Sequence, residues 1–157
     1  MRKALRASGF TLVELVMVII LISVLSALGA GLFSGRSAFS PLLVTQQLSS
    51  ATLLAQQAAL AGNSSDTLII RQTDDEFTFT TASSQFSLSR NGSTLAYSVE
   101  NAPYTNVPAG GLTVEFDDFG RVVSPMVRAN INFRIIGDST FNLCLSSLGA
   151  VYGGACR

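Results

Sequence analysis

The chain has 157 residues, of which 48% are hydrophobic and 13% charged, and its formal net charge is zero. This length allows one domain plus an anchor. Three of the ten cations precede Phe10, so the rest of the chain is mildly acidic, and we expect no nucleic-acid partner because phosphate neutralisation needs clustered cations. The sequence contains no histidine, the commonest metal ligand and general base. We therefore predict a chain that is not an enzyme and holds no metal or cofactor.

An apolar run without charge follows Glu14. Residues 15–35 contain no charged side chain, whereas Arg2, Lys3 and Arg6 precede the run. About 20 helical residues span a hydrocarbon core of about 30 Å. Because cations favour the cytoplasmic side, the pattern predicts a membrane helix with Met1 in the cytoplasm and the body across the membrane.

Three interpretations fit this N-terminal segment. An ordinary secretory signal has a basic start, an apolar middle and small residues for cleavage, here near positions 27–29. A permanent anchor is not cleaved, and a third kind of leader is cut before the apolar run. Glu14 distinguishes them, because a carboxylate inside a membrane segment is costly and an ordinary signal has no reason to carry one.

Residues 9–14 read GFTLVE and are followed by unbroken apolar residues. This segment resembles the leader of the type IV pilin and type II secretion pseudopilin superfamily. The resemblance implies that a prepilin peptidase cuts between Gly9 and Phe10, and that the new Phe10 amine is N-methylated. It also implies that Glu14 serves processing and filament assembly. The implied partners are the peptidase, other pilin or pseudopilin subunits, and an inner-membrane assembly machinery.

The resemblance suggests a physical role for Glu14. After cleavage Phe10 carries a cationic amine, and a cation or a carboxylate buried alone in an apolar helical bundle is unfavourable. Pairing between neighbouring subunits would cancel most of that cost and favour one axial register, as buried polar groups do in coiled coils. The alternative is that Glu14 lies at the membrane interface and extends into water.

A second helix is predicted from about residue 41 to residue 61. Ser40 and Pro41 are typical of a helix start, and Gly62 is typical of a helix end. One stripe is apolar at Val44, Leu48, Ala51, Ala55 and Ala58, and Leu42, Leu53 and Leu60 fall on nearly the opposite side. Such a helix has two partners, the body's own sheet and helices of adjacent subunits, or else it is fully buried within one domain.

Short runs rich in β-branched residues follow Gly62. Four hairpins are expected, pairing 67–71 with 77–81, 85–89 with 94–99, 112–116 with 121–123 and 131–136 with 141–145, with a last strand near 150–152. Their spacing favours an antiparallel sheet, and Asn91-Gly92 is the strongest turn signal. The predicted fold class is α+β and pilin-like: one long N-terminal helix, half membrane and half amphipathic, packed on an antiparallel sheet domain.

The two cysteines, Cys144 and Cys156, lie near the C-terminus. Their spacing suits a disulfide better than a metal cluster or two free thiols. The bond would close a loop of about a dozen residues and stabilise the fold by about 3 kcal/mol. Because a disulfide requires an oxidising compartment, it indicates export.

Two further segments, residues 112–121 and 141–151, resemble minor pseudopilins and minor pilins, and the cysteine pair is similar to that of minor pilins of the mannose-sensitive haemagglutinin type. We therefore expect a minor pilin or pseudopilin precursor that acts at the start or at the tip of a type IV pilus-like filament. Its parts would be a leader (1–9), a transmembrane assembly helix (10–33), an amphipathic helix (34–62) and a periplasmic sheet domain (63–157), in the inner membrane as a single-pass protein. The alternative is an exported globular binding protein or adhesin with an ordinary cleaved signal.

Overall fold

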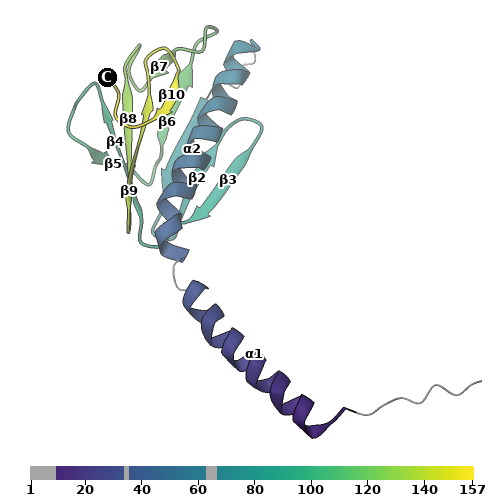
Figure 1. Cartoon of the computed structure of the whole chain (residues 1–157). Coiled ribbons are helices and arrows are strands. Elements are labelled where there is room, and N and C mark those ends of the chain that lie inside the picture. Colours follow the sequence, from purple (N-terminus) through teal and green to yellow (C-terminus); the bar gives the residue numbers. More distant parts are fainter. Residues whose placement is uncertain (1–9, 34–35, 63–66) are drawn as a thin grey trace, which may run out of the picture. The chain divides into compact units, whose positions relative to one another are not determined.

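A computed structural model describes residues 10–33, 36–62 and 67–157, shown in Figure 1. It contains two helices and ten strands in the order α1, α2, β1 to β10. The chain divides into two compact units, with the boundary after Arg36. The first unit contains α1 (Leu12–Phe33), and the second, here called the body, contains most of α2 (Arg36–Leu60) and all ten strands.

Helix α1 is the element that was expected to cross a membrane. Among the described residues, no helix combines the length and the apolar character that a crossing needs. A crossing takes about 20 consecutive, mostly apolar helical residues. The predicted placement as a single-pass inner-membrane protein with a periplasmic body is therefore wrong on this finding.

Helix α2 begins earlier than predicted and ends where predicted. Pro41 lies inside the helix, so Ser40 and Pro41 do not mark its start. At the other end, the amide of Gly62 donates to the carbonyl of Ala59 over 2.9 Å, and Gly62 has a φ of 68°. A left-handed glycine of this kind is a common way to end a helix.

One face of α2 is fully buried in the body. It carries the small and apolar residues Val44, Leu48, Ala51, Ala55 and Ala59. Four of these were predicted, whereas Ala58 is only half-buried. The buried hydroxyl of Thr52 is satisfied because it donates to the carbonyl of Leu48 over 2.7 Å. The other face exposes Leu43, Leu53, Leu54 and Leu60, so the alternative of a fully buried helix is wrong.

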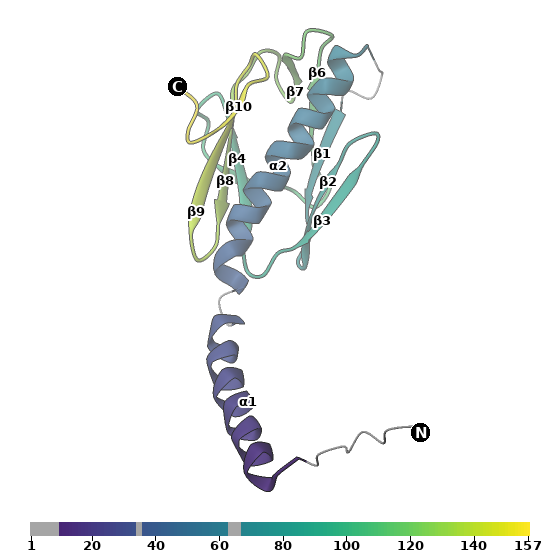
Figure 2. The ribbon, with the colours of Figure 1, turned by 45° about the vertical axis from the view of Figure 1, so that its right-hand side comes forward.

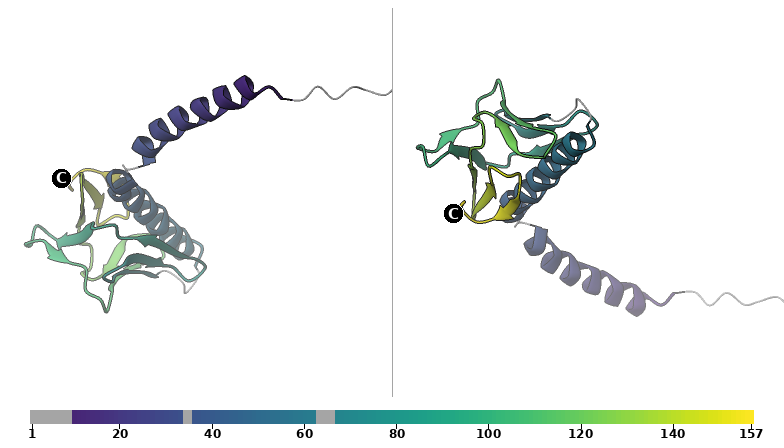
Figure 3. Two further views of the ribbon diagram at one scale, coloured as in Figure 1. Left: turned by 90° about the horizontal axis from the view of Figure 1, so that it is seen from below. Right: turned by 90° about the horizontal axis from the view of Figure 1, so that it is seen from above.

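The body contains two five-stranded antiparallel sheets. The first has the order β3-β2-β1-β6-β7, and the second has the order β10-β9-β8-β4-β5. Figures 2 and 3 show α2 lying across both sheets. The strands are β1 (Thr67–Gln72), β2 (Glu76–Thr80), β3 (Gln85–Ser89), β4 (Thr94–Val99), β5 (Thr105–Asn106), β6 (Leu112–Phe116), β7 (Val122–Ser124), β8 (Ile131–Ile136), β9 (Thr140–Leu145) and β10 (Val151–Gly153).

The predicted fold class, one long helix on one antiparallel sheet, is therefore wrong in two respects. The helix is two helices in separate units, and the sheet is two sheets. Three of the four expected hairpins form, but β3 and β4 do not pair, because β4 lies between β8 and β5 in the second sheet. The tight turn at Asn91-Gly92 does form, with φ of 44° and 79°, and it sends the chain from one sheet to the other.

Polar side chains hold this corner between the sheets. The guanidinium of Arg90 donates to the carbonyl of Thr73 over 3.1 Å and to the hydroxyl of Thr94 over 3.2 Å. The Gln72 side chain, at the end of β1, accepts a hydrogen bond of 2.6 Å from the amide of Leu95. The Gln72–Leu95 bond joins β1 of the first sheet to β4 of the second, and the Arg90 bonds hold the turn that carries the chain between the sheets.

Large apolar side chains from both sheets fill the core under α2. Phe77, Phe79 and Phe116 come from the first sheet, and Phe133 and Ile135 come from the second; all are 0–1% exposed. The two sheets therefore share one core, and each depends on the other for burial.

Phe133→Ala should lower the free energy of unfolding by about 3–5 kcal/mol, because it leaves a large cavity in a dense core. Phe119→Ala is the matched control, since Phe119 is 74% exposed and its ring centroid lies 4.7 Å from the guanidinium carbon of Arg121. It should cost less than about 1 kcal/mol. Urea unfolding of the full chain, followed by circular dichroism, measures both, and equal costs would contradict the shared core.

Candidate assembly site at the start of α1

The first turn of α1 is organised by Thr11 and Glu14. A carboxylate oxygen of Glu14 (Oε2) accepts hydrogen bonds from the Thr11 amide over 3.1 Å and from the Thr11 hydroxyl over 2.9 Å. In return, the Glu14 amide donates to the Thr11 hydroxyl oxygen over 3.2 Å. This is a capping box, in which the N-cap residue and the third helical residue satisfy each other's amides. It explains why the helix begins at Leu12.

The capping box also sets the charge state of Glu14. Hydrogen bonds from the Thr11 amide and then from the Thr11 hydroxyl favour the carboxylate, and together they lower the pKa of Glu14 below its ordinary value. The positive end of the helix dipole acts in the same direction. Both effects favour the ionised form of this side chain at the start of the helix.

The predicted site residues are placed as follows. Phe10 precedes the helix and is 74% exposed, and Glu14 lies four residues later in the first turn of α1. Gly9 lies outside the described residues. Thr11 was not predicted to take part, although the spacing Thr-x-x-Glu before an apolar run is a known sequence signal for the start of a helix.

The carboxylate of Glu14 retains capacity for a second partner. Its two contacts with Thr11 both use Oε2, and Oε1 accepts no hydrogen bond from the described residues. An ionised carboxylate has about four acceptor positions. Glu14 can therefore cap its own helix and bind an external cation at the same time, so capping does not exclude the predicted charge pairing.

The described surface of α1 around Glu14 is apolar. From Leu12 to Leu25 the large hydrophobic side chains are between 42% and 78% exposed. The hydroxyl of Ser23 is internally satisfied, because it donates to the carbonyl of Ile19 over 2.7 Å. An exposed apolar surface of this extent is typical of an interaction site.

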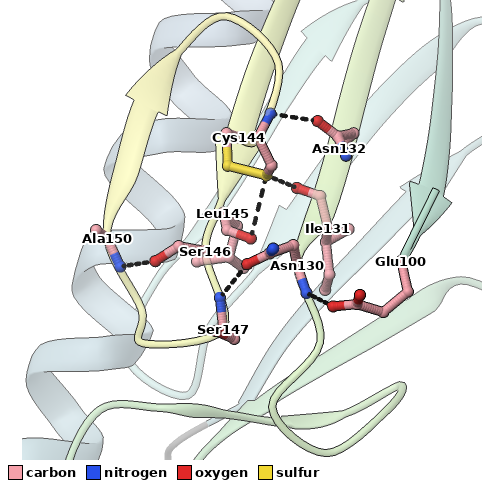
Figure 4. The surroundings of a disulfide bond; sticks show 10 residues. Glu100, Asn130, Ile131, Asn132, Cys144, Leu145, Ser146, Ser147 and Ala150 are labelled. Atoms are coloured by element: carbon pink, nitrogen blue, oxygen red, sulfur yellow. Dashed lines mark hydrogen bonds between the residues drawn. A yellow bond between two sulfur atoms is a disulfide. The ribbon is translucent and has the colours of Figure 1, made fainter.

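The disulfide lies at the C-terminal end of the body (Figure 4). Cys144, buried in β9, is bonded to Cys156, with 5.0 Å between their Cα atoms, so the predicted pairing is confirmed. The Cys156 amide donates to the Asn132 side-chain oxygen over 2.6 Å, and its sulfur lies 3.6 Å from the carbonyl oxygen of Ile131. These contacts attach the C-terminal residues to β8 as well as to β9.

Comparison with known proteins gives no match to a family model, no significant match to a curated protein and none to a solved structure. The resemblance to pilins and pseudopilins consequently stays a prediction.

Thr11→Ala removes the hydroxyl that donates to Glu14, so the pKa of Glu14 should rise toward its ordinary value, whereas Thr11→Ser should leave it low. The lowered pKa means that the carboxylate stabilises the helix start above the ordinary glutamate pKa of about 4.3, and that this contribution disappears as the pH falls through the lowered pKa. Carbon-detected NMR titration of the full chain measures the pKa. An unchanged value in Thr11→Ala would contradict the contribution of the hydroxyl bond to the pKa, because the backbone bond from residue 11 remains in this variant.

Removing the disulfide should lower the free energy of unfolding of the body by about 3 kcal/mol in the chain-entropy description. The double substitution Cys144→Ala with Cys156→Ala and the reduced wild-type chain should lose similar amounts. Urea unfolding with and without dithiothreitol measures the effect, and the double variant serves as the control because it has no bond to reduce. Equal stability of the oxidised and reduced wild type would contradict a stabilising role.

Proposed function

We propose that this chain is the precursor of a minor pilin or pseudopilin, a subunit that assembles through α1 into a type IV pilus-like filament. A prepilin peptidase cuts between Gly9 and Phe10, the Phe10 amine is methylated, and the subunit acts at the start or the tip of the filament. One observation carries the proposal: Glu14 is the only charged residue between Phe10 and Gly35, and it occupies the first turn of a helix whose apolar side chains are exposed.

The exposed apolar side chains of α1 supply the driving force. Each Leu, Ile or Val that becomes fully buried against a neighbouring subunit contributes about 1.5–3 kcal/mol, reduced by the entropy lost on association. Helices of adjacent copies can cover α1 on several sides at once. A bundle of such helices is the core that a filament needs.

Apolar contacts alone do not fix how far one helix slides along another. The amine that processing creates at Phe10 is cationic at neutral pH, with an ordinary pKa of about 7.7–8.0. Inside the bundle this amine and Glu14 of a neighbouring copy are both unfavourable unless paired. A single pair therefore selects one register. The capping box supports this role, because Thr11 holds the carboxylate in place before assembly.

The disulfide is consistent with the same proposal. Disulfides persist in oxidising compartments and are rare in the cytosol. The Cys144–Cys156 bond thus fits a body that works outside the reducing cytosol, as the body of a filament subunit does.

Glu14→Val should reduce incorporation into sheared filaments by about tenfold or more, because the amine of a neighbouring subunit loses its partner. Glu14→Gln should show the same loss, since it keeps the capping oxygen but not the charge. Glu76→Gln, which neutralises an exposed carboxylate of the body, is the matched control and should incorporate normally. Quantitative immunoblots of filament and cell fractions measure the ratio.

Intact mass of the wild-type and variant chains separates processing from assembly. The proposal expects a chain that begins at Phe10 with one added methyl group. A chain that begins near residue 30, or normal incorporation of Glu14→Val and Glu14→Gln, would overturn it.

A further inference from the structure

The two sheets have four edges, and three of them are short. The strand β5 has two residues, and β7 and β10 have three each. The edge at β7 is also covered, because the Val122 amide donates to the carbonyl of Ser147 and the Val122 carbonyl accepts from the amide of Arg128. The edge at β10 is tied down by the disulfide that follows it. Short and covered edges are the usual protection against pairing with another chain.

The fourth edge, β3, has none of these protections. It has five residues, QFSLS, with neither a charge nor a proline. Figures 1 and 2 show β3 on the outer side of its sheet, and in the described part of the chain no strand pairs with it on that side. An edge strand of this length without charge is a template for a further strand.

The hydrogen-bonding phase of the β2–β3 ladder shows which residues face outward. At one end of this ladder the amide of Thr81 donates to the carbonyl of Ser84, and at the other end the amide of Arg90 donates to the carbonyl of Asp75. Because bonded and non-bonded pairs alternate in an antiparallel ladder, residues 86 and 88 bond inward to β2. The amides and carbonyls of Gln85, Ser87 and Ser89 therefore point to the open edge.

The two faces of β3 differ in polarity. Phe86 lies opposite Phe79 and Leu88 lies opposite Phe77 in the ladder. Both Phe77 and Phe79 are fully buried, but Phe86 and Leu88 are only half-buried at the margin of the core. A further strand beyond β3 would complete their burial, while the side chains of the outward-bonding residues are polar and exposed.

We propose that β3 pairs with β3 of a second copy of this chain, antiparallel and with the two-fold axis at Ser87. In this register Gln85 lies opposite Ser89 of the second copy, and Phe86 lies opposite Leu88. Each outward pair exchanges two backbone hydrogen bonds, and the apolar pairs extend the core of both bodies. No charged side chain of β3 meets a like charge, because the strand has none. The contact is isologous, and it is independent of the proposed function of α1.

Cysteine crosslinking tests the pairing and its register together. Both native cysteines are bonded to each other, so a new cysteine is the only free thiol. Opposite residues in a hydrogen-bonded pair have Cα atoms about 5.5 Å apart, within disulfide range. Full-length Ser87→Cys, in mild detergent, should therefore form a covalent dimer on mild oxidation. Ser139→Cys, an exposed serine in the β8–β9 turn, is the matched control and should not.

The register of the pairing allows a second crosslinking test. Gln85→Cys and Ser89→Cys should each fail to crosslink with themselves, because like positions are four residues apart along the pair, about 13 Å. An equimolar mixture of the two variants should crosslink. Absence of the Ser87→Cys dimer, or equal crosslinking of Ser87→Cys, Gln85→Cys and Ser139→Cys, would overturn the proposal. A β3 edge that binds an extended segment of another protein would give the first of these results.

Discussion

The close approach of α2 to both sheets is the contact on which the body depends. Three alanines, Ala51, Ala55 and Ala59, occupy the centre of the buried face and leave space for phenylalanines from the strands. A helix with larger residues at these positions would separate the two sheets and leave gaps in a core packed at the density of an organic crystal. The buried side chains of the helix and of both sheets form one cluster. The same helix exposes leucines on its other side, so one element joins the core and leaves an apolar surface uncovered.

The start of α1 shows how one carboxylate can serve local and distant partners. Within the subunit, Glu14 completes a capping box with Thr11 and thereby orders the first turn. In the proposed filament its second oxygen meets an amine. These two uses reinforce each other, because a carboxylate whose position is already determined loses little conformational freedom when the external cation binds. Local hydrogen bonds thus lower the free-energy cost of a carboxylate in an apolar run before a neighbouring subunit binds.

Local signals predicted local structure well. Gly62 ended the helix, Val44, Leu48, Ala51 and Ala55 formed its buried face, and the cysteine pair formed a disulfide, since each depends on spacing within the chain. The capping role of Thr11 is equally local, since it follows from the spacing Thr-x-x-Glu. The division into two sheets depends on pairings between distant strands, β1 with β6 and β4 with β8, which no turn motif encodes. At Asn91-Gly92 the turn formed as the dipeptide demands, but the strands on its two sides belong to different sheets, and bonds from Gln72 and Arg90 connect residues distant in the chain at this corner.

The route of the chain through the two sheets has a consequence for the order of folding. The chain changes sheets at the β3–β4, β5–β6 and β7–β8 connections, so each sheet is interrupted and later completed. The pairing of β4 is complete only when β8 has formed, and that of β1 only when β6 has formed. Contacts between residues distant in the sequence therefore dominate folding, which makes it slow. Cys144 lies in β9 and Cys156 lies 12 residues later, so their sulfur atoms meet only when the segment after β10 has docked against β9. Oxidation of the two cysteines therefore requires the β9–β10 pairing, and the bond then holds the residues after β10 against β9.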